Sequence, residues 1–368
     1  MSWYDRSLAN GPNVASTITS RAKLLAELGR LDEAMKEYER ALVIEPGQAA
    51  AAWNLSLLQM LTGNFEAGWQ GREARWRIPQ LAAGYPKLST PIWLGDEPVA
   101  GKTIFICADE GLGDTIQFAR YVPMLAARGA RIILAVEKIL CPLLSGLTGV
   151  AVCLPKADET VLPPFDLHCP LDSLPLAFGT RPDTIPAEKA YLPPPAADRV
   201  RAWEDRLGAR NRMRVGLVWS GNPKHGNDRN RSMPLKTLAS ILDVDATFVS
   251  LQKDLRPADG EFLRERTDIM DVTADLTDFA DTAALISCLD LVIAVDTSVA
   301  HLAAALGRPT WILLPHVPDF RWLLDREDSP WYPTVRLFRQ TDSREYDSVV
   351  DRVRSDLIEL ISKGRAAG

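Results

Sequence analysis

Residues 291–315 constrain the fold of this chain most, because they contain a strand, a polar turn, a helix and a second strand in immediate succession. The apolar, β-branched run Leu291–Val295 predicts a strand buried on both faces. Asp296 or Thr297 can begin the following helix, and Thr310–Leu314 predicts the next strand. In such a β-α-β unit the free N–H groups of the helix face the carboxyl edge of a parallel sheet, where a phosphate is favoured.

The polar residues of this turn allow two interpretations. Asp296 and Thr297 can be caps only, with His301 a semi-buried side chain, or all three can form a binding cluster. The pattern Asp-Thr-Ser-x-x-His-x-x-x-Ala-x-Gly-x-Pro at 296–309 resembles the donor-nucleotide motif of the ADP-heptose:lipopolysaccharide heptosyltransferases, glycosyltransferase family 9. This resemblance implies that Asp296, Thr297, Ser298 and His301 bind the diphosphate side of a nucleotide-sugar. The family usually has glycine where Ser298 stands.

A second motif lies much earlier in the chain. Gly111-Leu112-Gly113-Asp114 follows a predicted strand at Thr103–Ala108 and opens a helix predicted to run from Thr115 to about Arg128. Gly111 and Gly113 let the backbone approach a ligand closely. A dinucleotide fingerprint is excluded because position 116 is isoleucine rather than glycine. The motif resembles the first family 9 motif, which implies that Asp114 is the base acting on the acceptor hydroxyl; the alternative is a helix cap.

A long polar loop at 220–232 follows a predicted strand at Val215–Trp219. Its cations are suited to neutralising the charge that develops on a departing nucleoside diphosphate, although a solvated loop is the alternative. The resemblance implies this role for one cation of the loop, with Arg231 as the closest match. Gln252 leaves the carboxyl end of the predicted strand Thr247–Leu251 and could contact the nucleotide. The cations and histidine of the loop are Lys224, His225, Arg229 and Arg231.

The sequence predicts neither a metal nor another cofactor. Asp243-Val244-Asp245 has the spacing of a metal-binding pair, but it precedes a strand and so falls at the amino edge of the sheet, where we expect a solvated turn. Another polar loop, Pro315–Trp322, combines His, Asp, Arg and Trp. It suits a sugar-binding loop, but a packed surface turn is favoured.

The N-terminal region contains a repeat. Gly29 recurs as Gly63, and this interval of 34 residues is the tetratricopeptide period. Ala34, Tyr38 and Ala41 occupy the helix-packing positions of that motif. We predict one regular repeat and one degenerate repeat that pack on the following domain. They are either a docking surface for an acceptor or partner protein, or a structural cap.

The predicted fold is α/β. Strands and helices alternate in two sets on either side of Pro193-Pro194-Pro195, which predicts two doubly wound, Rossmann-like lobes facing a cleft. The resemblance implies the same GT-B layout, here with an N-terminal all-α tetratricopeptide segment. The predicted parts are the repeats (1–77), a connector (78–101), an acceptor-side lobe (102–195), a nucleotide-sugar lobe (196–343), and a C-terminal helix packing back on the acceptor-side lobe (344–368).

Composition narrows the classes of partner. The net charge of −6 argues against nucleic acid or an anionic membrane surface. No leader sequence or transmembrane segment is predicted, and a cytoplasmic location is expected. The odd number and scattered positions of the five cysteines predict reduced thiols rather than a disulfide or zinc framework.

These features together predict a metal-independent, inverting glycosyltransferase that transfers a sugar from a nucleotide-diphosphate sugar to an acceptor hydroxyl. The acceptor is a saccharide or a protein. Two alternatives stay open: a protein O-glycosyltransferase whose repeats recruit a polypeptide, and a catalytically silent scaffold that binds nucleotide-sugars.

Overall fold

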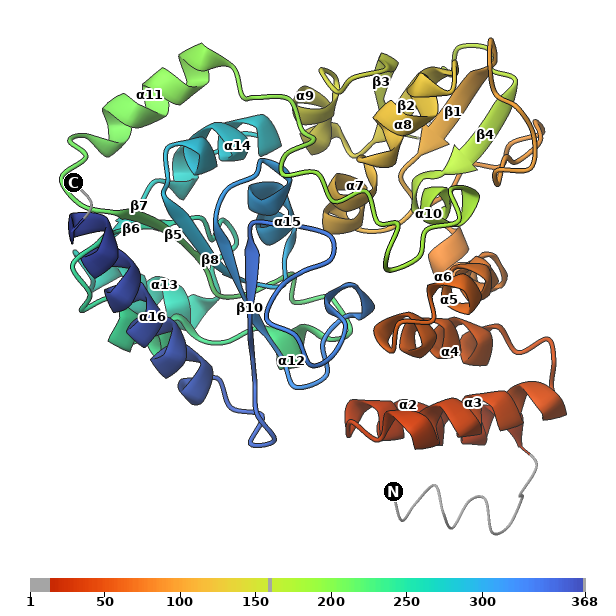
Figure 1. The fold of residues 1–368 in the computed structure, drawn as a ribbon, viewed down its shortest axis with the longest axis horizontal. Helices are drawn as coiled ribbons and strands as arrows, with labels where there is room; N and C mark the ends of the chain where they lie inside the picture. The colour runs from red at the N-terminus through yellow and green to blue at the C-terminus, as the bar shows by residue number, and fades with distance from the viewer. Residues whose placement is uncertain (1–13, 158–160, 367–368) are drawn as a thin grey trace.

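The N-terminal part of the chain folds into two helical hairpins (Figure 1). The computed structural model describes residues 14–157 and 161–366, so the predictions for residues 1–13 and 367–368 lie outside the described residues. In each hairpin a glycine with left-handed backbone, Gly29 (φ 79°) or Gly63 (φ 93°), lies in the turn between the helices. The repeated glycines thus mark two equivalent turns. The helices are α2 (Ala15–Glu27), α3 (Leu31–Ile44), α4 (Ala49–Leu61) and α5 (Phe65–Arg72).

The packing positions of the repeat motif are buried. Ala34, Tyr38 and Ala41 of α3 are each no more than 1% exposed. A 3-10 turn, η1 (Glu73–Arg77), and the short α6 (Pro79–Ala82) connect the hairpins to the rest of the chain. We call residues 14–82 the helical segment.

The first lobe is built on a four-stranded parallel sheet with the order β3-β2-β1-β4. Short helices connect the strands, and the strand β2 has the bounds that the sequence predicts. The elements are β1 (Thr103–Cys107), α7 (Leu112–Phe118), α8 (Tyr121–Ala127), β2 (Arg131–Val136), η2 (Lys138–Leu140), α9 (Cys141–Leu144), β3 (Val150–Pro155), β4 (Leu167–Pro170), η3 (Leu171–Ser173) and α10 (Leu174–Ala177).

The helix predicted from Thr115 to Arg128 differs from the structure at its start and in its middle. It begins earlier because Gly111 is the N-cap of α7, and it is divided into α7 and α8. Pro123 explains the division, since it has no N–H to donate to the carbonyl of Ala119.

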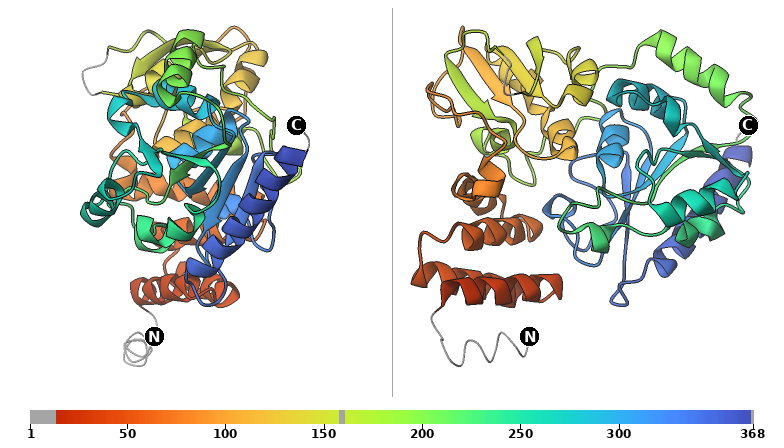
Figure 2. Two further views of the ribbon diagram at one scale, coloured as in Figure 1. Left: turned by 90° about the vertical axis from the view of Figure 1, so that its left-hand side faces the viewer. Right: turned by 180° about the vertical axis from the view of Figure 1, so that it is seen from behind.

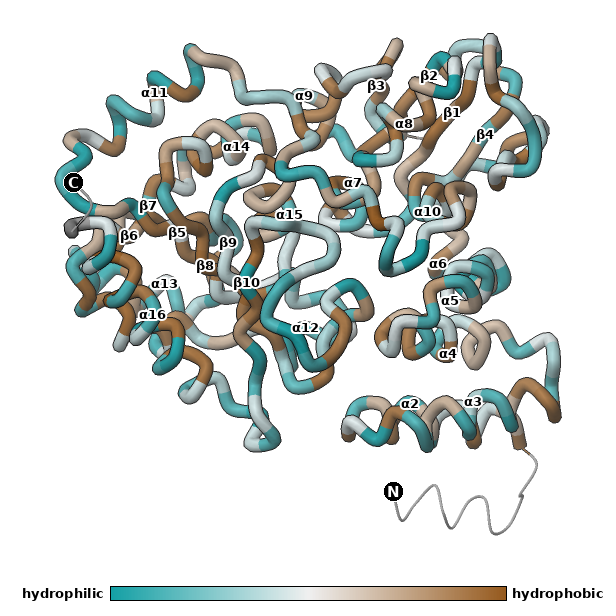
Figure 3. Tube along the Cα trace, in the orientation of Figure 1, coloured by the Kyte–Doolittle hydropathy of each residue, from teal (hydrophilic) through white to brown (hydrophobic). Residues whose placement is uncertain are grey.

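The second lobe is built on a six-stranded parallel sheet with the order β10-β9-β8-β5-β6-β7. Its two central strands are buried along their whole length and are mainly hydrophobic (Figure 3), as expected for strands covered on both faces. The elements are α11 (Ala197–Leu207), β5 (Arg214–Val218), α12 (Asp228–Arg231), η4 (Leu235–Ile241), β6 (Thr247–Ser250), α13 (Pro257–Arg264), β7 (Ile269–Asp271), η5 (Thr273–Asp275), α14 (Phe279–Ser287), β8 (Leu291–Val295), α15 (Ser298–Ala305), β9 (Thr310–Leu314), η6 (Phe320–Trp322), β10 (Val335–Arg339) and α16 (Asp347–Ala366).

The C-terminal helix α16 corrects one prediction. It does not pack back on the first lobe but lies along the second, against β10 and η4 (Figure 1). Val349, Val350, Val353 and Leu357 form one apolar stripe on α16 and are buried in the same core as the strands of the second sheet.

Each sheet reverses its strand order at one place, and these places position the site. In the first sheet β1 lies between β2 and β4, and in the second sheet β5 lies between β6 and β8. Successive crossovers leave in opposite directions at such a point, which opens a crevice at the carboxyl ends of the strands. The segments that follow β1, β5 and β8 carry the predicted site residues, except Gln252, which follows β6.

The helical segment lies beside both lobes (Figure 2) and contacts each of them through side chains. Trp69 donates a hydrogen bond from Nε1 to the carbonyl of Thr180 in the first lobe (2.9 Å) and packs edge-on against Phe320 of the second. At the other end of the segment, Glu27 forms an ion pair with Arg229 of the second lobe (3.1 Å).

Candidate active site

One cavity contains every residue that the sequence predicts for the site. Its volume is about 1170 Å³, and its wall is formed by the first lobe, the second lobe and the helical segment. The roles of the ten residues stay predictions, but their placement together is a property of the fold. They are Gly111, Gly113, Asp114, Lys224, Arg231, Gln252, Asp296, Thr297, Ser298 and His301.

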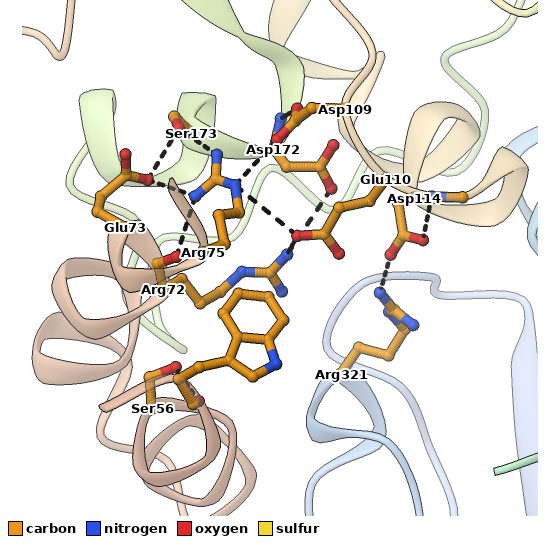
Figure 4. A network of polar contacts seen from close by, with 12 residues as sticks. Ser56, Arg72, Glu73, Arg75, Asp109, Glu110, Asp114, Asp172, Ser173 and Arg321 are labelled. Carbon is orange, nitrogen blue, oxygen red and sulfur yellow. Dashed lines mark hydrogen bonds and ion pairs between the residues drawn. The ribbon is translucent and has the colours of Figure 1, made fainter. Parts of the chain in front are cut away.

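Asp114 lies in the first turn of α7, where two groups hold its carboxylate. Oδ2 accepts a hydrogen bond from the backbone N–H of Gly111 (3.1 Å), and Oδ1 accepts one from Arg321 of the second lobe (Figure 4). Burial alone would raise the pKa of Asp114, but the charges of Arg321 and Arg72 outweigh it and keep the pKa below its ordinary value. The carboxylate is therefore ionised at neutral pH.

The two sequence motifs meet at Gly113 and His301. A β-carbon on Gly113 would lie 2.9 Å from Cδ2 of His301, so only glycine lets α7 pack this closely on α15. The His301 ring is 2% exposed. Its Nδ1 is hydrogen-bonded to the hydroxyl of Tyr332 (2.9 Å), and it stacks on Trp322.

Asp296 follows β8 and faces the other edge of the same imidazole. Its Oδ1 lies 3.6 Å from Nε2 of His301. Burial opposes ionisation of Asp296, but the contact with His301 and the nearby charge of Arg321 hold its pKa well below the ordinary value. Asp296 is thus an anion at the end of the central strand.

Five buried polar atoms in the cavity wall have no hydrogen-bond partner among the described residues. Three of them, Ser220 Oγ, Arg231 Nε and Thr297 Oγ1, belong to the second lobe. The other two are Nε of Arg72 and Nε of Arg321, whose guanidinium groups are paired through other nitrogens. Thr297 occupies the N-cap position of α15 but makes no capping hydrogen bond with its side chain. Buried polar groups nearly always have partners, so this concentration indicates a polar ligand at the N-terminus of α15.

The cations of the loop 220–232 have different environments. Arg231 is half-buried, and its Nη1 donates to the backbone carbonyl of Asp296 (3.1 Å), which places the guanidinium beside the N-terminus of α15. Lys224 and His225 are exposed at the cavity, whereas Arg229 pairs with Glu27 of the helical segment.

Gln252 lies in the cavity wall, but its amide already has protein partners. Oε1 accepts from the backbone N–H groups of Trp219 (3.2 Å) and Ser220 (2.9 Å), and Nε2 donates to the carbonyl of Asp254. Gln252 therefore fixes the start of the loop that follows β5.

Two sets of acidic residues have to be considered as metal-binding sites. Asp243 and Asp245 lie in an exposed turn before β6, as predicted. Glu110, Asp114 and Asp172 each place a carboxylate oxygen within 4.8 Å of the others, a spacing that a metal ion could fit. The guanidinium groups of Arg72 and Arg321 are paired with Glu110 and Asp114 respectively.

The loop Pro315–Trp322, for which the sequence favours a packed surface turn, instead reaches the centre of the site. Arg321 is 7% exposed and pairs with both Asp114 and Asp319. Trp322 is fully buried against His301. The prediction is wrong because the loop is covered by residues of the helical segment and the first lobe that are distant in the sequence.

No role is predicted from the sequence for the face of the helical segment that lines the cavity. Trp53, Asn54 and Leu57 of α4 line the cavity. Next to them, Arg72 and Arg75 are each 1% exposed and pair with acidic residues after β1. The concentration of Trp and Arg at 69–77 was the available signal.

Among the described residues, no helix has both the length and the apolar character that crossing a lipid bilayer requires.

Comparison with known proteins agrees with these features. The model of glycosyltransferase family 9 (heptosyltransferase) matches residues 263–314, which include β8, α15 and β9. Protein FlbA of Caulobacter vibrioides is 26% identical over 394 aligned positions, which cover 96% of this chain and 63% of FlbA. The chain thus spans less than two thirds of the length of that relative.

Two solved structures share the fold. Escherichia coli ADP-heptose lipopolysaccharide heptosyltransferase II has a TM-score of 0.50 and 17% identity, over 72% of this chain and 99% of that one. A family 9 glycosyltransferase from Veillonella parvula has a TM-score of 0.50 and 12% identity, over 70% of this chain and 91% of that one. The two parallel sheets are therefore those of the GT-B fold, and within the second lobe residues 263–314 match the model of glycosyltransferase family 9.

Proposed function

We propose that this chain is a metal-independent, inverting glycosyltransferase that transfers a sugar from a nucleotide-diphosphate sugar to an acceptor hydroxyl. The observation that carries the proposal is the set of buried, unpartnered polar groups at the N-terminus of α15, which faces an ionised Asp114 across one cavity. The first feature suits a diphosphate, and the second suits a hydroxyl that must lose a proton.

In the proposed mechanism, Asp114 removes the proton of the acceptor hydroxyl. The resulting oxygen nucleophile forms a bond to the anomeric carbon as the bond from that carbon to the diphosphate oxygen breaks, which inverts the carbon. The N-terminus of α15 at Thr297 and Ser298, together with Arg231, stabilises the negative charge on the departing diphosphate. Lys224, an exposed residue of the cavity wall, contributes to the same charge neutralisation.

The donor is tested first by ligand-induced stabilisation. We expect one nucleotide family among ADP, UDP, GDP and CDP and their sugars, with ADP-heptose included, to raise the melting temperature with or without EDTA. A ligand that binds only the folded state at one hundred times its Kd adds about 2.7 kcal/mol of stability. If no diphosphate shifts the midpoint at millimolar concentration, with or without magnesium, the proposal fails.

His301→Ala is expected to weaken nucleotide binding, because the ring supports both Asp296 and the close approach of α7. We expect the Kd measured by calorimetry to rise roughly tenfold, as for the loss of one charge-assisted hydrogen bond. His168→Ala is the matched control, since His168 is also buried but does not line the cavity. Equal Kd values for the two variants would remove His301 from the donor site.

A polypeptide acceptor is the second candidate. It is favoured by the position of Trp53, Asn54 and Leu57, which place the helical segment inside the cavity wall rather than at a distance from it. Transfer to unfolded polypeptides but not to saccharides, measured with the stabilising nucleotide-sugar, would select this candidate. The silent scaffold is selected instead if that nucleotide-sugar binds but is neither transferred nor hydrolysed.

A further inference from the structure

Two arginines of the helical segment are buried at the edge of the active site. Arg72, at the end of α5, and Arg75, in η1, are each 1% exposed. Arginine is seldom this buried unless its charge is paired. Both side chains point to the loop that follows β1 and ends at Gly111 (Figure 4).

Arg75 anchors Asp109, the second residue of that loop. Its Nε donates to Oδ2 of Asp109 (2.9 Å), and its Nη2 donates to Oγ of Ser173 (2.6 Å). Oδ1 of Asp109 accepts in turn from the backbone N–H of Asp172 (3.1 Å). Asp109 is therefore fixed from both sides.

Arg72 holds the next residue. Its Nη2 donates to Oε1 of Glu110 and lies 3.8 Å from Oδ1 of Asp172. The guanidinium carbon lies 5.1 Å from the ring centre of Trp53 and 5.1 Å from that of Phe320, so aromatic rings limit its movement.

Glu110 is connected to Asp114 through one backbone group. The residue after Glu110 is Gly111, whose N–H donates to Oδ2 of Asp114. A rotation of the backbone at Glu110 would move that N–H and with it the carboxylate. The orientation of Asp114 thus depends on where Arg72 holds Glu110.

The charges around Glu110 also make the position of the Asp114 carboxylate depend on Arg72. Glu110 and Asp114 have carboxylate oxygens within 4.8 Å of each other, and Asp114 is paired with Arg321. Burial and the charge of Asp114 raise the pKa of Glu110, whereas the charge of Arg72 opposes this rise. If Arg72 were absent, the Glu110 carboxyl would lose this partner and would no longer be held away from Asp114 and Arg321. With Arg72 in place, each carboxylate has a guanidinium of its own.

We propose that Arg72, through its ion pair with Glu110, is a positioning residue for Asp114, so that the helical segment is part of the catalytic machinery. This inference rests on the proposed function. It assigns to the last helix of the repeats a role in turnover that is distinct from docking a partner or capping the lobe.

The test compares Arg72→Gln, Glu110→Ala and the double variant, with transfer or hydrolysis of the stabilising nucleotide-sugar as the readout. We expect each single variant to lower kcat roughly 10- to 100-fold, as for a displaced catalytic group, with donor Kd unchanged. The double variant should lose no more than either single variant, because both break the same contact. Glu110→Gln keeps an acceptor for Arg72 and should retain kcat within about threefold.

Arg77→Gln is the matched control, since Arg77 belongs to the same η1 turn but is exposed. If the single variants keep the kcat of this control, or if their losses add in the double variant, the inference is overturned. Should Arg72→Gln fail to fold, Glu110→Ala against Glu110→Gln carries the test, because Glu110 lies at the cavity and is only half-buried.

Hydrogen exchange gives a second readout that needs no activity. Arg72→Gln should speed exchange of the backbone amides at 110–118 and leave those at 291–305 protected. Unchanged exchange at 110–118 would contradict positioning. If the wild type binds no nucleotide while exchange responds as expected, the proposed function fails and the structural coupling between Arg72 and the loop stands.

Discussion

Asp114→Asn is expected to lower the turnover of the confirmed donor and acceptor by roughly two to four orders of magnitude, the range measured when a general base is lost. Asparagine keeps the shape of the side chain and an oxygen that can accept from Gly111, but it cannot take up the proton. In the proposed mechanism the donor is bound by the second lobe, so the Kd of the nucleotide should change little.

Asp281→Asn is a close structural control. Asp281 also lies in the first turn of a helix, accepts from a backbone N–H (Thr277, 3.1 Å) and pairs with an arginine (Arg199, 2.6 Å), but it does not line the cavity. Equal turnover of the two variants would remove Asp114 from the mechanism.

The low pKa of Asp114 fixes the direction of its pH dependence. Because Arg321 and Arg72 lower the folded-state pKa, the carboxylate is ionised at every pH above about 4. Its contribution to stability is therefore complete above that pH and is lost as the pH falls through the folded-state value. Any loss of activity between pH 5 and 7 must come from another group.

Trp69→Ala is expected to have the largest effect on stability, about 3–5 kcal/mol of the free energy of unfolding. The indole is 2% exposed and packs edge-on against Phe118 of the first lobe, and against Phe320 and Trp331 of the second. Its removal leaves a cavity where all three parts of the chain meet.

The measurement is denaturant unfolding, with Trp76→Ala for comparison. Trp76 belongs to the same stretch but is half-buried, and its ring packs against Tyr85. We expect a clearly smaller loss for Trp76→Ala. Similar losses for the two variants would contradict a junction centred on Trp69.

The elements whose bounds agree best with the prediction are those that the local sequence determines. The strands β2, β8 and β9 have the predicted bounds because each consists almost entirely of apolar residues and lies between polar turns. The division between α7 and α8 also has a local cause, Pro123, but a helical pattern on either side hides it. The α16 helix has an apolar stripe that is clear in the sequence, yet the stripe does not say which sheet it covers.

Site residues that belong to a short sequence motif could be predicted. Site residues that depend on contacts between distant segments could not. Asp114 and His301 stand in short patterns, and both reach the cavity. Arg321 pairs with Asp114 across 207 positions, and nothing near Arg321 in the sequence indicates that partner. Arg72 and Arg75 belong to a charged stretch of the kind that is usually exposed, and only the fold supplies Asp109 and Glu110 to pair with them.

The contacts of the helical segment with both lobes limit how its length can vary. A fragment that begins at β1 would have the carboxylates of Asp109, Glu110 and Asp172 without their arginines, so the two lobes are not an independent unit for expression or for exchange between proteins. An extra hairpin inserted between α5 and β1 would separate Arg72 from Glu110. Repeats added on the N-terminal side of α2 would leave these contacts in place, whereas the segment from α5 to the loop after β1 has to be inherited as one piece.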